Sequence, residues 1–307
     1  MTTNFSRAPA TRPPEAQARE TVSQAASRLR QRRRAWRLAA WAVPIALFVA
    51  VAVVGPILVP YDPVTVRLGD RLRPPGAVLT SGTRAWLGTD QVGKDLLAQV
   101  LQGARISLLV GVATVLTAGC IGLAVGIPAG YFGGALDGFL MRIADLQLAF
   151  PSLLLAILIA AVLGRSVTNV IITLSVTRWV TFARVVRATT LATREREFVM
   201  AARASGASTN RIMGRHIVPL TVTPLVVVAT VELGLVILAE ASLSFLGLGT
   251  PPDHPSWGLV IANGRDYLST AWWISTIPGI ALSLVILAVG LFGDQLSDFL
   301  NPRTVSN

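Results

Sequence analysis

Three ionisable residues lie inside long apolar stretches of this 307-residue chain: Arg178, Glu232 and Glu240. A carboxylate is costly at membrane depth, so it usually faces the interior of a helix bundle and marks a pathway. One interpretation is a proton relay, in which a carboxylate changes its charge during transport. The other is a hydrogen bond between packed helices or a partly wetted pore wall. The two interpretations predict different classes of transport protein.

A second candidate is GTDQVGKD at residues 88–95, which nearly matches the phosphate-binding loop G-x-x-x-x-G-K-[ST]. That loop needs a hydroxyl after its lysine to hold Mg²⁺ and a buried strand before its first glycine. Here Asp95 follows Lys94 and would place a negative charge beside the phosphates, and the preceding RAWL is too short and too polar for the strand. We therefore predict that this chain hydrolyses no ATP.

Metal chemistry and nucleophilic catalysis are not indicated either. Cys120 is the only cysteine and lies in an apolar run, which excludes an internal disulfide and a thiolate cluster. The two histidines, His216 and His254, fall in opposite predicted compartments, so they cannot share a metal ion. No catalytic or metal-binding residue is predicted.

The composition places the chain in the membrane class. It is 52% hydrophobic and 14% charged, with a mean hydropathy of +0.61, whereas soluble domains average about 25% charged residues. The net charge of +11 is concentrated in residues 1–37 and 184–216, next to apolar runs. The positive-inside rule explains this placement and puts both segments in the cytoplasm. Nucleic-acid binding is therefore not predicted.

Six apolar runs approach the length that crosses a ~30 Å hydrocarbon core at 1.5 Å per residue. The second run carries Gly122, Gly126 and Gly130, a ridge without side chains on which another helix can pack closely. A cytoplasmic turn is expected around Asp137 and Arg142. The predicted spans are residues 36–59, 106–130, 146–163, 170–186, 220–246 and 274–291.

These spans predict an all-α membrane protein with six transmembrane helices and both termini in the cytoplasm. Residues 1–35 have too few large apolar side chains to fold and form a disordered basic tail. Residues 36–103 hold the first span and an external segment, 104–300 a five-helix core, and 301–307 a cytoplasmic tail. A cleaved signal peptide is the alternative for the first run, but its length, its prolines and the VPYDP at its end argue against one.

A polar stretch, EFVMAARASGASTNRIMGRHIVP at residues 197–219, separates the fourth and fifth spans within a cytoplasmic loop at 195–219. On a helix, Phe198, Ala201, Ala202 and Ser205 share one face. Those small residues would let the backbone of a second protein come close. Arg196, Met200 and Arg203 share another face, which could steer that partner.

The same stretch carries signals for a bend between two helices. Gly206 is expected to end the first helix, because glycine adopts the left-handed turn at low cost. Ser208 is placed to cap a second helix, and Pro219 to end it and open the next apolar run. An amphipathic loop without a partner would explain the arginines but not the glycine and proline at the helix ends.

This stretch resembles the "EAA" loop of ABC-importer permeases, whose pattern falls here on Ala201, Ala202, Gly206, Ile217 and Pro219, with Met200 where the family has its glutamate. The wider residue pattern of the loop is similar to that of the dipeptide, oligopeptide and nickel branch of this family. So are YDP at 61–63, LGTDQVGKD at 87–95, GARISL at 103–108 and EASLSFLGLG at 240–249. The resemblance implies that the loop docks into an ATPase subunit through Glu197, Phe198, Ala201, Ala202, Arg203, Gly206, Ala207, Ser208, Arg211, Ile217 and Pro219.

The resemblance further implies a multi-pass permease subunit of the bacterial inner membrane that imports di- or oligopeptides. Its expected partners are a homologous permease, two ATPase subunits that use ATP and Mg, an external binding protein and membrane lipid. No cofactor is expected on this chain. The alternatives are a permease for nickel or another small solute and, from a different class, a proton-coupled carrier built on Arg178, Glu232 and Glu240.

Overall fold

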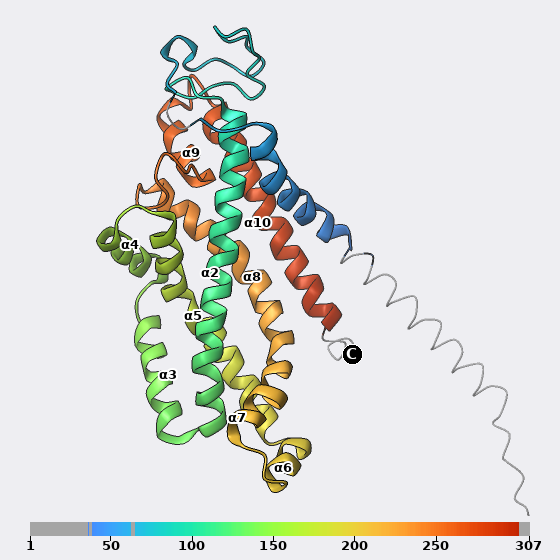
Figure 1. Cartoon of the computed structure of the whole chain (residues 1–307). Helices are drawn as coiled ribbons and strands as arrows, with labels where there is room; N and C mark the ends of the chain where they lie inside the picture. Colours follow the sequence, from blue (N-terminus) through green and yellow to red (C-terminus); the bar gives the residue numbers. More distant parts are fainter. Residues whose placement is uncertain (1–35, 37–38, 63–64, 301–307) are drawn as a thin grey trace, which may run out of the picture.

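The computed structural model describes residues 36, 39–62 and 65–300 (Figure 1). The predicted tails at 1–35 and 301–307 lie outside the described residues. Within the described part, the regular elements are helices. Two isolated antiparallel bridges, Val78 with Arg84 and Thr89 with Asp95, lie in the segment before Leu96. The predicted all-α fold is confirmed.

Among the described residues, five helices are long and apolar enough to cross a membrane, and one bent pair of helices would make a sixth span. Figure 1 shows the long helices packed along one another as a bundle. Two of them extend well past their predicted ends, since α5 continues to Arg194 and α10 to Leu300. The five are Ala39–Leu58, α2 (Leu96–Phe132), α5 (Val167–Arg194), the helix Thr209–Phe245 that includes α8 (Val218–Phe245), and α10 (Trp273–Leu300).

Helix α2 begins earlier than the predicted Ile106. The Asp95 side chain accepts a hydrogen bond from the backbone N–H of Ala98 at 3.1 Å, which caps the helix so that it begins at Leu96. The polar residues that follow Leu96 were assigned to the external segment by their composition. They are the first turns of a helix of 37 residues, about 55 Å long at 1.5 Å per residue.

The third predicted span, residues 146–163, contains a sharp bend near its start. The structure has α3 (Gly134–Leu148) and α4 (Ser152–Leu163), bent by 87° around Pro151. Helix α4 has 12 residues, about 18 Å, which is too short to cross a ~30 Å core alone. The predicted turn around Asp137 and Arg142 is wrong, because both lie inside α3. The turn is at Gly133, whose φ of +66° suits glycine.

The predicted glycine ridge is confirmed as a close helix contact. Gly122, Gly126 and Gly130 of α2 face α5. A Cβ atom at Gly126 would lie 2.6 Å from the carbonyl oxygen of Ala183, and one at Gly130 would lie 2.7 Å from Cβ of Thr190. Helices α2 and α5 therefore pack backbone against backbone, and a larger residue on the ridge would push them apart.

The two ends of the bundle differ in construction. We call the end with residues 60–95, α9 (Trp257–Gly264) and the 3-10 turn Arg265–Tyr267 the loop end, at the top of Figure 1. The opposite end carries α6 (Glu197–Ala204) and α7 (Thr209–Ile212), and we call it the coupling end. Between them, one apolar core joins α2, α4, α5 and α8, and another joins the Ala39–Leu58 helix to α2, α9 and α10.

Candidate functional site

The stretch 197–219 forms the expected helix, bend and helix. Helix α6 ends at Ala204, and Gly206 follows with a φ of +78°. The N–H of Gly206 donates to the carbonyl of Arg203 at 3.0 Å, and the N–H of Ala207 donates to that of Ala202 at 3.1 Å. This pair of bonds is the Schellman arrangement that closes a helix on a glycine. The prediction for Gly206 is therefore confirmed.

The second helix begins at the predicted position but without the predicted cap, and it ends differently from the prediction. Helix α7 begins after Ser208, as expected, but the Ser208 side chain makes no capping hydrogen bond. Pro219 does not end this helix. It occupies the first turn of α8, where a missing N–H costs little, and a five-residue π-helix, Met213–Ile217, joins α7 to α8. The helix is therefore continuous from Thr209 to Phe245.

An apolar cluster holds α6 and α7 against the end of α2. Val199, Ile212 and Ile217 are fully or almost fully buried there. Tyr131 of α2 packs against them, and so do Ala202 and Ala207. Ala202 is half-buried beside this cluster, so part of its side chain packs against the protein itself. Val199 was missed, although its spacing to Ala202 on one helix face was a usable signal.

Several predicted docking residues remain exposed at the coupling end. Phe198 is 43% exposed, and the neighbouring Met200 is 49% exposed. Ala201, which follows Met200, is exposed beside them. The other exposed predicted residues are Glu197, Arg203, Gly206, Ser208, Arg211 and Pro219.

Two arginines attach the coupling end to the last turn of α2. Nη1 of Arg194 donates to the carbonyl oxygens of Gly130 at 2.9 Å and Tyr131 at 3.3 Å, which satisfies carbonyls that a helix end leaves free. The guanidinium of Arg203 lies over the Tyr131 ring, 5.6 Å from its centroid. Sequence reasoning missed this attachment, because Arg194 and Tyr131 are far apart in the chain.

The structure separates the three ionisable residues of the apolar stretches into two sites. Arg178 of α5 faces Glu232 of α8, with Nη1 and Oε2 3.6 Å apart. That distance makes an ion pair but exceeds a hydrogen bond. The Arg178 side chain is 20% exposed and that of Glu232 is 7% exposed. Arg178 therefore lies against α8 and is only partly exposed.

Glu240 lies apart from this ion pair and is fully buried. Its carboxylate accepts hydrogen bonds from the hydroxyl of Ser107 on α2 at 3.2 Å and from that of Ser244 at 2.6 Å. Ser244 in turn accepts hydrogen bonds from Ser256 at 3.0 Å and from the N–H of Thr250 at 3.2 Å. Glu240 therefore joins α2, α8 and the segment that leads into α9.

The phosphate-loop lookalike GTDQVGKD is a hydrogen-bonded turn at the loop end. Asp90 accepts hydrogen bonds from the backbone N–H groups of Val92 and Lys94 and from the Gln99 side chain, at 2.8 to 2.9 Å. Asp95 caps α2 as described above. The carboxylates thus stabilise the turn and the helix that follows. The acidic residues of the motif therefore have a structural role.

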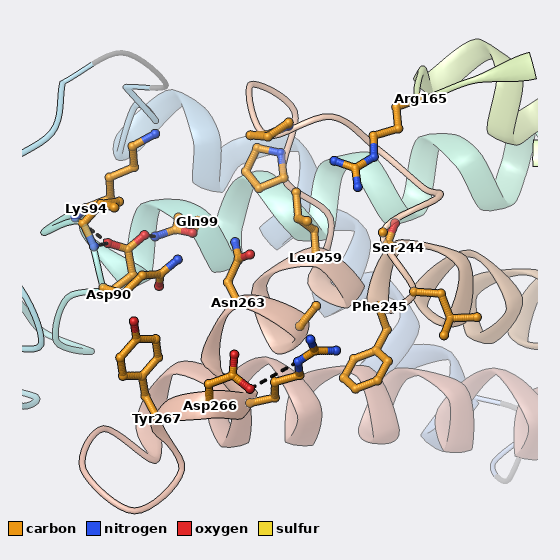
Figure 2. Close-up of a pocket in the computed structure, with 18 of the residues that line it drawn as sticks. Asp90, Lys94, Gln99, Arg165, Ser244, Phe245, Leu259, Asn263, Asp266 and Tyr267 are labelled. Atoms are coloured by element: carbon orange, nitrogen blue, oxygen red, sulfur yellow. Dashed lines mark hydrogen bonds and ion pairs between the residues drawn. The ribbon is translucent and has the colours of Figure 1, made fainter. Parts of the chain in front are cut away.

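A cavity of about 590 Å³ opens between this turn, α9 and the end of α8. Lys94 and Asp90 lie toward one end of it and Arg165 toward the other, with Asn263 between them (Figure 2). Burial and nearby carboxylates, chiefly Asp90, raise the pKa of Tyr61 to about 12. Tyr61 is therefore protonated at neutral pH. Its hydroxyl donates a hydrogen bond to the carbonyl oxygen of Pro252 at 3.2 Å.

Neither a metal cluster nor a paired cysteine is found in the part of the chain that the structure describes. No group of three or more His, Cys, Asp or Glu side chains gathers among those residues. Cys120 is exposed on α2. The arrangement offers instead a packed bundle, two buried carboxylates and an exposed helical pair at one end.

Comparison with known proteins identifies the class of protein. Residues 122–306 match the family described as binding-protein-dependent transport system inner membrane component. The chain belongs to this family. It is therefore a transport subunit of the inner membrane, of the class of ABC permeases, and not an enzyme.

Named relatives place the chain in the peptide and nickel branch. It is 43% identical over 272 residues, 89% of each chain, to a putative peptide transport system permease protein of Brucella suis. It is 38% identical to a di/tripeptide transport system permease of Pseudomonas aeruginosa, covering 84% of this chain and 85% of that one. A nickel transport system permease of Escherichia coli is 36% identical, at 88% and 96% coverage.

A solved structure is also similar. A chain of the MetNI methionine ABC transporter, in inward-facing conformations, matches with a TM-score of 0.48 and 18% identity, covering 63% of this chain and 94% of that chain.

Proposed function

We propose that this chain forms half of the translocation pathway of an ATP-driven importer for di- or oligopeptides delivered by an external binding protein. Its partners are a second, homologous permease and two ATPase subunits, which bind ATP and Mg. The peptide permeases among its relatives, at 38 to 43% identity, support this substrate class. The loop end faces outward and the coupling end faces the cytoplasm, as the arginines of residues 184–216 favour.

The observation that carries the proposal is the continuous helix Thr209–Phe245. It begins at the coupling end, next to the exposed α6, and carries both Glu232 and Glu240 within the bundle. A push on α7 therefore passes into α8 without an intervening loop. When ATP closes the ATPase pair, this helix transmits the movement to its neighbours α2 and α5, and the pathway reopens to the outside.

The exposed Ala201 gives the cleanest test of docking, because a change there leaves the protein's own cluster intact. Ala201→Glu places a charge between Phe198 and the partner surface. We expect about a tenfold loss of ATPase stimulation by the loaded binding protein in the purified complex, equivalent to about 1.4 kcal/mol of lost coupling. Ala192→Glu adds the same charge at an exposed position of α5 outside residues 197–219 and serves as the matched control.

The outcome separates a docking surface from a solvated loop. Ala201→Glu should lower ATPase stimulation and weaken the recovery of the ATPase subunits with the permease, while Ala192→Glu changes neither. Full stimulation in the Ala201→Glu complex would show that residues 197–219 do not couple to the ATPase.

Nickel is the second candidate substrate, favoured by the 36% identity to a nickel permease. The two substrates are distinguished by uptake into proteoliposomes that contain the complete complex with its binding protein. Uptake of a radiolabelled dipeptide that excess unlabelled peptide suppresses, and that nickel leaves unchanged, supports the peptide proposal. Nickel uptake without peptide uptake would replace it.

A further inference from the structure

The exposed face between the Ala39–Leu58 helix and α2 contains a charge without a protein partner. Arg105 of α2 is exposed and lines an apolar groove of about 480 Å³ with Val53, Ile57, Leu109 and Val112. Among the described residues, Arg105 makes no hydrogen bond, ion pair or ring contact. A charged side chain inside a membrane span marks a functional site whose partner should be named.

The depth of Arg105 follows from its neighbours on the first helix. A Cβ atom at Gly55 would lie 2.7 Å from Leu101, and Ala52 packs in the same cluster as Ala104. Arg105 therefore lies at about the level of Ala52, six residues before the helix ends at Leu58, or about 9 Å inward.

The side chain can cover this distance. Side chains on a helix lean toward its N-terminus, which for α2 is the loop end. An arginine stem lies along apolar surface while its head reaches the water interface. The Arg105 guanidinium thus reaches the headgroup level of the leaflet on the loop-end side, while its stem lies in the groove.

The groove continues deeper than the charge. Leu109 is 52% exposed and Val112 is 40% exposed. Val112 is seven residues further along α2, about 10 Å deeper in the membrane. The surface therefore presents one cation at headgroup level with an apolar channel running inward from it.

We propose that this groove binds an anionic phospholipid, whose phosphate pairs with Arg105 and whose acyl chain lies along Leu109 and Val112. A guanidinium matches a phosphate with two parallel hydrogen bonds. An acyl chain fills the apolar channel that runs inward from this charge. A partner's carboxylate would satisfy the charge but not the apolar channel beneath it, so the lipid fits both features. This inference is independent of the transported substrate.

Lipid retention by the full-length chain tests the site. The purified protein is reconstituted in nanodiscs with equal amounts of phosphatidylethanolamine and phosphatidylglycerol, re-extracted in mild detergent, and its retained lipids are counted by native mass spectrometry. We expect wild type to retain phosphatidylglycerol preferentially. Arg105→Gln should lose about fivefold of that retention, since a cation near the surface contributes about 1 kcal/mol toward an anionic lipid.

Matched variants separate the site from general charge and from misfolding. Arg71→Gln removes the same charge from an exposed position at the loop end and should retain lipid like wild type. Leu109→Trp keeps the charge but fills the channel, and should also lower retention. Arg105→Lys keeps the charge without the paired geometry and should retain an intermediate amount. Melting temperature and gel-filtration profile verify that each variant is folded.

Three results would overturn the proposal. Equal retention by wild type and Arg105→Gln would show that no lipid depends on this arginine. Displacement of the retained phosphatidylglycerol by inorganic phosphate in the buffer would indicate a free-anion site. When the chain is purified together with the second permease, a loss of that permease in Arg105→Gln with lipid retention unchanged would assign the groove to that protein's carboxylate.

Discussion

Glu232 and Glu240 are the same residue type on the same helix, eight positions apart, yet the bundle accommodates them in different ways. Glu240 is fully buried and accepts two hydroxyl hydrogen bonds. Glu232 faces the Arg178 guanidinium at 3.6 Å. A buried polar group whose bonds are all made specifies one arrangement of its neighbours. A longer ion pair lacks that directional constraint, so it tolerates small displacements of the two helices.

The two sites also join different elements. The Glu240 network connects α2, α8 and the segment before α9, close to the loop end. The Glu232 ion pair connects α5 and α8 alone, nearer the coupling end. The two carboxylates share no hydrogen-bonding residue and lie about 12 Å apart along the helix axis. This separation argues against a proton relay. It favours a fixed structural contact at Glu240 and a displaceable contact at Glu232.

The largest expected effect comes from removing the Glu240 carboxylate. Glu240→Leu leaves the buried hydroxyls of Ser107 and Ser244 without their acceptor. We expect a loss of about 3 kcal/mol, since each unsatisfied buried group costs 1–3 kcal/mol. Thermal unfolding of the purified chain measures the loss. If Glu240→Leu melts with wild type, the hydroxyl network does not hold the bundle together.

Breaking the ion pair from one side should have the second-largest effect. Glu232→Ala leaves Arg178 without its carboxylate, and we expect a destabilisation of about 2 kcal/mol, below the value for fully buried pairs because Arg178 is partly exposed. The double variant Arg178→Gln with Glu232→Ala removes both charges and should recover more than half of the loss, and the single variant Arg178→Gln completes the cycle. Purely additive losses in this double-mutant cycle would show that the two residues do not interact.

Removing a single donor to Glu240 should cost less. Ser107→Ala deletes one hydrogen bond of the network and should destabilise the chain by about 1 kcal/mol. Ser242→Ala is the matched control on α8, because the Ser242 hydroxyl bonds only to the Leu238 carbonyl of its own helix. Chemical denaturation of the two variants side by side measures the difference, and equal stability would remove Ser107 from the network.

The smallest effect on stability is expected from Glu240→Gln, which keeps the shape and most of the hydrogen bonds. Glu240→Gln should destabilise the chain by less than about 1 kcal/mol, and both Glu240→Gln and Glu232→Gln should retain ATP-dependent uptake. Uptake into proteoliposomes with an uncoupler present is the measurement. A glutamine variant that assembles and hydrolyses ATP but transports nothing would require a carboxylate that changes its charge.

The long helices and the bend at Gly206 could be predicted from the sequence, because apolar length and glycine conformation are local properties. The 87° break of the third span at Pro151 could not, since a proline close to a helix start is compatible with a straight helix as well as with a bend. Pro219 misled the prediction because a proline suits a helix start as well as a helix stop, and the π-helix before it keeps the chain helical.

The candidate sites were identified by residue type but not by partner. Buried charges in apolar runs are visible in a sequence, so Arg178, Glu232 and Glu240 were found. Their division into two sites depends on contacts between residues far apart in the chain, such as Ser107 with Glu240. Ala202 shows the same limit, because its place beside Tyr131 of α2 in one apolar cluster joins residues far apart in the chain.

The central claim is that transport through this chain is driven by ATP through residues 197–219 and not by a proton gradient through the buried carboxylates. The most direct test is peptide uptake by proteoliposomes that contain the whole complex, measured with and without ATP and with and without an uncoupler. The account predicts uptake that requires ATP, persists with the uncoupler and falls about tenfold in Ala201→Glu. Uptake that continues without ATP and collapses with the uncoupler would contradict it.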